Sequence, residues 1–410
     1  MTEMMRASKT PFQRSGGVLL HPTSLPSSCH VGDLGPEAER FARFLAEAAL
    51  SWWQTLPVGP TGYGDSPYQA LSGHAGSALL VSPDLLVEDG LLLREELPRE
   101  GQSGPADYHR ARGAREPLLR RAFERFEARP RDPAFDEFLE ENRGWLEDWA
   151  LFRALKRAHA ERPWTDWAPD LRSRATEALE RARRTLDGEI RFERFVQFEF
   201  ERQWTRLRDL CRSLGLSLLG DLPIFVAHDS VEVWIVAEDL GVVTPEVKAL
   251  RDRYAFPGMR VLQFAFGSDP EAPSYRPHRY VPRCVVYTGT HDNDTTVGWF
   301  RDVGGSSSTR TPAEIEVERA SALRYLGTRG DEIHWDMIRL AWMSVADVAI
   351  APVQDLLGLG TEARMNLPGR AEGNWRWRMS AGALDARVAE RLHELTSTYE
   401  RVPPRPGLRS

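Results

Sequence analysis

The short spacing between two acidic strand ends most constrains how this chain can fold. Two apolar runs, 216–219 and 235–237, are followed by acid, at Asp221 and at Glu238. Such runs are typical of buried strands that deliver a carboxylate to the rim of a parallel barrel. Consecutive parallel strands need a crossover of about a dozen residues or more, and a full barrel unit takes about 30. Only 17 positions separate Asp221 from Glu238. Either the strands are not sequential neighbours or one unit is missing, and we favour the missing unit.

The length and charge suit one large α/β barrel with an insertion. The chain has 410 residues, a net charge of −7 and a sequence pI near 5.9. Arginine and glutamate are interleaved throughout, so the concentrated positive field that a nucleic-acid partner requires is not expected. The charge favours a neutral or small substrate.

The cysteines and the apolar runs indicate the compartment. Cys29, Cys211 and Cys284 are odd in number and far apart, which predicts neither a disulfide framework nor a zinc site and suits a reducing cytoplasm. The first 17 residues contain no apolar core of a signal peptide, and no run approaches the ~18 apolar residues of a membrane span. We therefore expect a cytoplasmic protein without a membrane partner.

The order of periodic segments predicts a barrel interrupted by helices. Residues 17–21 and 52–58 are predicted strands, and the apolar stripe of 36–48 predicts a helix between them. The chain then divides into a first barrel part (1–83), a helical insertion (84–203) with solvated Arg and Glu rows, and a second barrel part (204–410). In this last part we expect a helix at 333–344 and strands at the following segments: 216–219, 235–237, 259–266, 285–288 and 348–353.

The loop G-P-T-G-Y-G-D-S-P-Y-Q at 59–69 resembles a glycine-rich phosphate cradle only superficially. Asp65 and Pro67 stand where a helix N-terminus should receive the anion. A sugar suits the loop better, because Tyr63 and Tyr68 can stack on a pyranose while Asp65 and Ser66 bond its hydroxyls. A surface turn that uses Gly and Pro only for geometry remains the alternative.

Two acidic clusters at strand ends could serve transfer chemistry at a glycosidic bond. Such chemistry needs a carboxylic acid for the leaving oxygen and, in retaining enzymes, a second carboxylate ~5–5.5 Å away. Glu238 is the predicted acid/base, with a structural salt bridge to an arginine as the alternative. Asp292 could bind and distort the sugar while His291 donates to a hydroxyl. A metal site is the rival interpretation of this cluster, but the calcium-loop pattern fails because Val297 stands where glycine is required.

Six motifs in order resemble the 4-α-glucanotransferase family (amylomaltases or disproportionating enzymes, glycoside hydrolase family 77), from about residue 16 to 400. The motifs are H-P-T-S-L-P (21–26), P-x-G-P-T-G-Y-G-D-S-P-Y-Q (57–69), G-D-L-P-I-F-V (220–226), A-E-D-L-G (237–241), T-G-T-H-D-N-D-T (288–295) and A-R-M-N-L-P-G-R (363–370). The resemblance implies a TIM-type (β/α)8 barrel of the α-amylase superfamily kind, with no metal or cofactor. It implies transfer of α-1,4-glucan segments between maltooligosaccharides through a covalent glycosyl intermediate, and it implies no oligomeric state.

The same resemblance assigns residue roles. Glu238 matches the acid/base and Asp292 the aspartate that stabilises the transition state, with His291 in the same subsite. Ser66 and Tyr68 match glucan-binding positions. Asp221 matches a barrel aspartate that in the family pairs with an arginine near the nucleophile.

The chain departs from the family between V-E-V-W (231–234) and I-V-A-E-D (235–239). The family's nucleophile motif, R-I-D-H-F, is absent from the sequence, as is its W-G-N-P-L-Y loop. We therefore predict that strand four and its nucleophile are missing and that the activity of this chain is impaired. A non-catalytic α-glucan-binding remnant is the alternative function, and a poorly folded product is a third possibility.

Overall fold

The fold is described from a computed structural model. It describes residues 13–98, 104–221, 227–235, 258–304, 310–370 and 372–402. The strands are β1 (Ser15–Leu19), β2 (Trp52–Gln54), β3 (Ser217–Leu219), β4 (Gly258–Val261), β5 (Cys284–Tyr287) and β6 (Val348–Pro352). They form one parallel sheet in the order β3-β2-β1-β6-β5-β4. Within the described ranges, no strand pairs with the outer edge of β3 or of β4.

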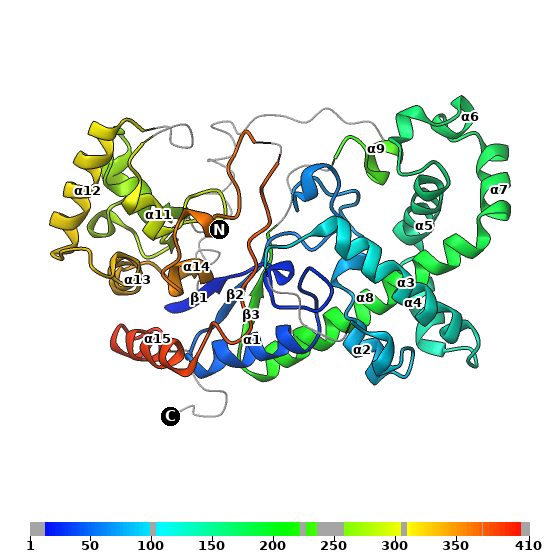
Figure 1. The fold of residues 1–410 in the computed structure, drawn as a ribbon, viewed down its shortest axis with the longest axis horizontal. Coiled ribbons are helices and arrows are strands. Elements are labelled where there is room, and N and C mark those ends of the chain that lie inside the picture. Colours follow the sequence, from blue (N-terminus) through cyan, green and yellow to red (C-terminus); the bar gives the residue numbers. More distant parts are fainter. Residues whose placement is uncertain are drawn as a thin grey trace, which may run out of the picture.

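Helices cover the sheet and extend from both of its sides (Figure 1). At one end of the molecule lie the insertion helices, and at the opposite end lie α11, α12 and α13. The helices are α1 (Pro36–Glu47), α2 (Pro83–Glu88), α3 (Tyr108–Glu127), α4 (Pro133–Glu141), α5 (Arg143–Ala158), α6 (Pro169–Arg172), α7 (Thr176–Thr185), α8 (Asp187–Ser213), α9 (Val231–Ile235), α11 (Thr296–Arg301), α12 (Pro312–Leu326), α13 (Ile333–Met343), α14 (Val353–Leu356) and α15 (Ala386–Thr398).

Both faces of the sheet are buried, as expected for parallel strands. Successive residues of a strand point to opposite faces, so Val18 and Trp53 join the large core beneath α1, α13 and α15. Leu19 and Ile350 join the second core, on the other face. Gly17 permits the close pairing of β1 with β2, because a Cβ there would lie 2.5 Å from the Cβ of Trp52.

The insertion is helical, and it holds its own aromatic core. Trp149, Phe152, Trp167 and Phe198 belong to this cluster. The sequence prediction that its charged rows are solvated is wrong for several residues: Lys156, Glu193 and Glu199 are at most 3% exposed. The helical period places them on the inner side, where each pairs with an oppositely charged group. The predicted domain boundary at residue 203 falls within α8, and the division into three parts stays a prediction.

Three predicted strands differ in the structure. The predicted strand at 52–58 ends at Gln54. Ile235, predicted to begin a strand, is the last residue of α9, and 236–237 lie outside the described residues. The predicted strand at 259–266 ends at Val261 and continues as a 3-10 helix, Leu262–Ala265. Leu262 and Ala265 are both fully buried, a three-residue period that an apolar run does not distinguish from a strand.

The buried guanidinium of Arg401 ties the C-terminal segment to the sheet. It donates to six backbone carbonyl oxygens around the end of α13 and the starts of β1 and β6. Arg401 is fully buried. Arg14 also donates to the Trp342 and Ser344 carbonyls, but removal of Arg401 would still break six hydrogen bonds to backbone in the interior.

We therefore expect Arg401→Met to lower the free energy of unfolding by about 3 kcal/mol. Urea denaturation monitored by circular dichroism measures this loss. The control is Arg40→Ala, which removes an exposed arginine paired with Glu37 and should cost less than about 0.5 kcal/mol. A loss below about 1 kcal/mol for Arg401→Met would contradict the structural role assigned to it.

Candidate active site

A cavity of about 660 Å³ lies where loops from several strands meet. The loop after β2 supplies Tyr68, the end of β3 leads to Asp221, and the loop after β5 supplies His291. The carboxyl ends of parallel strands share one edge of a sheet, which explains why residues so far apart in sequence converge. The lining includes Tyr63, Ser66, Tyr68, Gln69, Asp221, His291, Asp292, Asn366, Arg370, Asn374 and Trp375.

Tyr68 connects the two sides of this cavity. Its hydroxyl donates to Oδ2 of Asp221 at 2.5 Å. Its ring stacks on His291 with centroids 5.1 Å apart, and it lies 6.1 Å from the Trp375 ring. Burial raises the pKa of Tyr68, and the hydrogen bond to Asp221 raises it further. The phenol therefore stays a hydrogen-bond donor, and three rings form an aromatic wall.

The loop after β5 carries His291 and Asp292. Oδ1 of Asp292 accepts a hydrogen bond from Nδ2 of Asn366 at 2.6 Å, and Nη2 of Arg364 donates to the Asp292 carbonyl at 2.6 Å. The Asp292 side chain is 49% exposed, so it can contact a ligand in the cavity. Nε2 of His291 lies 3.4 Å from Oδ1 of Asp292. Burial lowers the pKa of His291 despite the nearby carboxylates of Asp292 and Asp221.

The predicted sugar-binding pair Asp65 and Ser66 is divided by the structure. Ser66 lines the 660 Å³ cavity, and its Oγ accepts from the Tyr68 amide. Asp65 is instead paired with Arg112 of α3 and lines a separate cavity of about 270 Å³. A long-range partner on the insertion thus orients Asp65 away from the cavity that Ser66, Tyr68, Asp221, His291 and Asp292 share.

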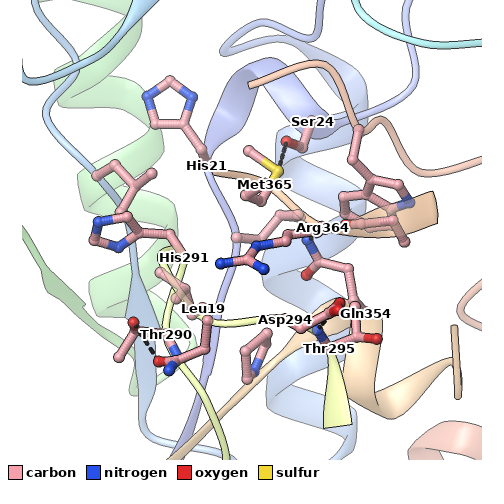
Figure 2. A pocket seen from close by; sticks show the side chains of 16 residues that line it. Leu19, His21, Ser24, Thr290, His291, Asp294, Thr295, Gln354, Arg364 and Met365 are labelled. Atoms are coloured by element: carbon pink, nitrogen blue, oxygen red, sulfur yellow. Dashed lines mark hydrogen bonds between the residues drawn. The ribbon is translucent and has the colours of Figure 1, made fainter. Parts of the chain in front are cut away.

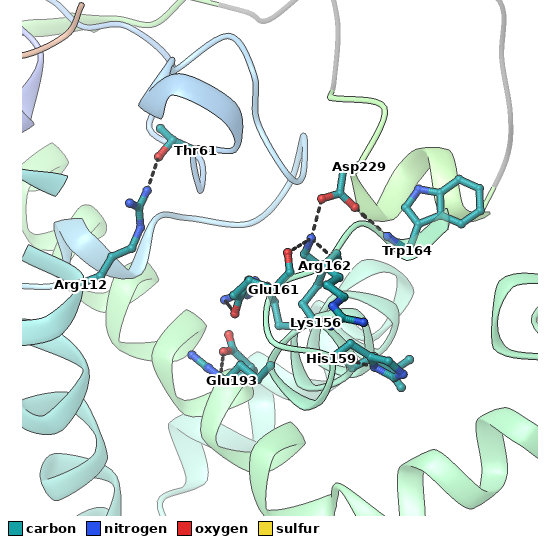
Figure 3. A network of polar contacts seen from close by, with 12 residues as sticks. Thr61, Arg112, Lys156, His159, Glu161, Arg162, Trp164, Glu193 and Asp229 are labelled. Atoms are coloured by element: carbon teal, nitrogen blue, oxygen red, sulfur yellow. Dashed lines mark hydrogen bonds and ion pairs between the residues drawn. The ribbon is translucent and has the colours of Figure 1, made fainter. Parts of the chain in front are cut away.

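Glu238, the predicted acid/base, lies outside the described residues. Two other acids lie near residues 234 and 235, where the chain departs from the family, and both are held outside the 660 Å³ cavity. The carboxylate of Asp229 accepts hydrogen bonds from Nζ of Lys156 at 2.5 Å and from the Trp164 amide at 3.0 Å (Figure 3). Glu232 accepts from the Ser72 hydroxyl at 2.7 Å and from the amide of Gly73. Both carboxylates therefore anchor the 227–235 segment and do not line the 660 Å³ cavity.

Sequence reasoning assigned no role to the wall that follows β6. Asn366, Arg370, Asn374 and Trp375 line the cavity from this side. The available signals were the motif A-R-M-N-L-P-G-R at 363–370, which contains Asn366 and Arg370, and the Gly-rich and Trp-rich stretch at 369–378, whose composition indicates a loop but not its location. Trp375 is 4% exposed, and its left-handed backbone (φ 62°) turns the chain at the cavity.

A second, much smaller cavity of about 30 Å³ lies beside His291 (Figure 2). Its lining includes His21, Asp294, Gln354 and Arg364. This volume suits about one water molecule. It is too small for a sugar ring, so we assign its lining residues a structural role beside the larger cavity.

The described residues contain no candidate metal centre, no disulfide and no membrane-spanning helix. Within them, no group of three or more His, Cys, Asp or Glu side chains is arranged to hold a metal ion. Cys29, Cys211 and Cys284 are buried and unpaired. Among the helices of the described ranges, none has the length and apolar character needed to cross a membrane.

A parallel α/β fold with an aromatic and carboxylate-lined cavity at its strand ends is typical of carbohydrate-active enzymes of the barrel class. The family of 4-alpha-glucanotransferases, glycoside hydrolase family 77, matches residues 20–235 and 235–384. The chain belongs to this family.

The individual relatives agree with this assignment. A 4-alpha-glucanotransferase of Thermus thermophilus is 38% identical over 95% of this chain and 99% of its own length. The chloroplastic/amyloplastic 4-alpha-glucanotransferase of Solanum tuberosum is 32% identical over 95% and 87%. The structure of amylomaltase from Streptococcus agalactiae in complex with acarbose superimposes with a TM-score of 0.87 at 26% identity, covering 95% of this chain and all of that one. The predicted TIM-type α/β fold is confirmed.

The comparisons also bear on the short spacing before Glu238. The two matched family segments meet at residue 235. The alignment with the Thermus relative extends over 510 positions, 100 more than the 410 residues of this chain. Many positions of that relative therefore have no counterpart here.

The buried side chain of His21 predicts how the stability of the protein depends on pH. Its Nδ1 accepts from the Thr23 amide and its Nε2 contacts the Pro57 carbonyl at 3.1 Å, which requires a neutral ring. Burial lowers the pKa of His21 to about 4. The unfolded chain, with a histidine pKa of about 6.5, binds the proton first as the pH falls, so stability is lost below that pH.

We expect His21 to contribute a loss of about 1–2 kcal/mol between pH 6.5 and pH 5, measured by urea denaturation at each pH. His21→Gln should flatten this part of the profile. The matched control is His109→Gln, at an exposed histidine of α3, which should leave the slope unchanged. An equal slope in the wild type and in His21→Gln would contradict the assignment.

Proposed function

We propose that the 660 Å³ cavity binds an α-1,4-glucan and that the chain is a 4-α-glucanotransferase for maltooligosaccharides whose turnover is strongly reduced. The support is the family match together with the arrangement around Tyr68. The rings of Tyr68, His291 and Trp375 offer the aromatic faces on which a pyranose stacks. Ser66, Asp221 and Asp292 offer oxygen acceptors for its hydroxyls.

In the proposed reaction, Glu238 protonates the leaving glycosidic oxygen and Asp292 stabilises the positive charge that develops on the sugar. His291 stays neutral beside Asp292, because burial lowers its pKa, and it can donate one hydrogen bond to a hydroxyl. Tyr68 holds Asp221 at the cavity wall. The roles of Glu238, Asp292, Ser66, Tyr68, His291 and Asp221 are proposals that rest on the resemblance and on this geometry.

The covalent step lacks its nucleophile in this chain. The support is the missing R-I-D-H-F motif, the family match that breaks at residue 235, and the alignment gaps. Asp229 and Glu232 are held by Lys156 and by Ser72. A nucleophile splits one high barrier into two lower ones, and its loss removes that route. A non-catalytic α-glucan-binding remnant of the family is therefore the alternative function.

The three buried, unpaired cysteines support the cytoplasm as the proposed compartment. No oligomeric state is proposed.

We expect no more than trace disproportionation of maltotriose, measured by chromatography of the products. The Thermus thermophilus relative, assayed in parallel, serves as the positive control. Turnover within about tenfold of that relative would contradict the prediction. In that case Asp229→Asn and Glu232→Gln would identify which acid has replaced the missing nucleophile.

We expect Tyr68→Ala to weaken maltoheptaose binding about tenfold or more, because it removes a stacking ring and the hydroxyl that holds Asp221. Isothermal titration calorimetry measures the Kd. Tyr68→Phe keeps the ring and should lose less. The matched control is Tyr399→Phe, which deletes a hydroxyl bonded to Arg339 far from the cavity. An unchanged Kd in Tyr68→Ala would exclude the loop from glucan binding.

A further inference from the structure

The loop 288–296 carries His291 and Asp292, and one buried carboxylate binds both of its ends. Thr288 directly follows β5, and Thr296 is the first residue of α11. The Thr288 hydroxyl donates to Oδ2 of Asp355 at 2.5 Å. The Thr296 amide donates to Oδ1 at 2.7 Å and the Thr296 hydroxyl to Oδ2 at 2.8 Å.

These three donors lie in the interior of the protein. Thr288 and Thr296 are fully buried, and Asp355 is 1% exposed. Burial raises the pKa of Asp355, and the hydrogen bonds from Thr288 and Thr296 oppose that rise. A buried carboxylate is tolerated only where donors satisfy it. These three hydrogen bonds therefore compensate for the burial of the Asp355 carboxylate.

The tip of the loop is held by different residues. Asn366 and Arg364 bind Asp292, as described above, and Thr361 donates to Oδ2 of Asp294 at 2.9 Å. Nε2 of Gln263 donates to the Asp294 carbonyl at 2.8 Å. All these contacts act on the middle of the loop. Asp355 alone among the residues named here joins the end of β5 to the start of α11.

We propose that Asp355 is a positioning residue for glucan binding, which closes the base of the 288–296 loop so that His291 and Asp292 face the cavity. The proposal rests on the proposed function. Asp355 does not line the 660 Å³ cavity, so it acts through Thr288 and Thr296 and not by contact with the sugar. Its position at the start of α14, directly after β6, links the loop to the neighbouring strand of the sheet.

Substitutions of Asp355 and of its donor Thr288 separate hydrogen bonding from packing. Asp355→Ala removes every acceptor. Asp355→Asn keeps the shape and one oxygen for the Thr296 amide, and its amide group can donate to the threonine hydroxyls, which both donate and accept. Asparagine keeps both the volume and the hydrogen bonds, so its rescue shows that the negative charge is not required, whereas Thr288→Val keeps the volume, removes one donor and separates bonding from core packing.

The experiment measures the Kd for maltoheptaose by calorimetry, well below the Tm of each variant, and hydrogen exchange of the amides in 288–296. We expect Asp355→Ala to weaken binding about tenfold and to accelerate exchange in this loop, and Asp355→Asn to stay within about threefold of the wild type. Exchange in α15 should not change.

The matched control is Glu199→Ala, which removes another buried carboxylate, in the insertion, where it pairs with Arg202. It should lower the Tm and leave the Kd unchanged. If Asp355→Ala does not fold, Thr288→Val removes one of the three donors and should shift both readouts in the same direction.

An unchanged Kd and unchanged loop exchange in Asp355→Ala, with Tyr68→Ala weakening binding, would overturn the proposal. If the wild type fails to bind maltoheptaose, the proposed function is wrong, and Asp355 then has no role in glucan binding. Loop exchange then still decides whether Asp355 holds the 288–296 loop.

Discussion

Parallel pairing of β1 with both of its neighbours is the constraint on which the site depends. β1 joins β2 in the register Gly17 to Trp52 and joins β6 in the register Gly17 to Ile350. Because all three strands run in one direction, the loops that follow them emerge on one side of the sheet. A shift of one residue would exchange the two faces of a strand and change which side chains pack in the two cores. The cavity is a consequence of that alignment.

Hydrogen bonds between the segments that follow different strands hold the site together. Tyr68 and Asp221 link the loop after β2 to the end of β3. Asp292 and Asn366 link the loop after β5 to the one after β6. Hydrogen bonds between loops restrict the relative motion of the strand ends, and preorganised groups lose less entropy when a ligand binds. The same bonds that stabilise the rim therefore shape the cavity.

Local patterns predicted the elements better than they predicted the contacts. The helix at 333–344 and the strands at 285–288 and 348–353 follow from periodicity, and the structure has them with small changes at their ends. The pairing of Asp65 with Arg112 joins residues 47 positions apart, and the position of Trp375 depends on a loop. No local period encodes such contacts. The resemblance brought Tyr68, Asp221 and His291 together as candidates, but only coordinates could show the stacking between them.

The contacts of Asp229 and Glu232 show why neither acid is readily available as a nucleophile in the cavity. Lys156 is 2% exposed, and its ammonium is satisfied by Asp229 and by the carbonyls of Glu161 and Arg162. Moving Asp229 into the cavity would leave that buried charge without its counterion, at a cost of about 3–5 kcal/mol. Glu232 is similarly committed to Ser72 and to a backbone amide. The contacts that hold the 227–235 segment therefore oppose the movement that either acid would need to act as a nucleophile in the cavity.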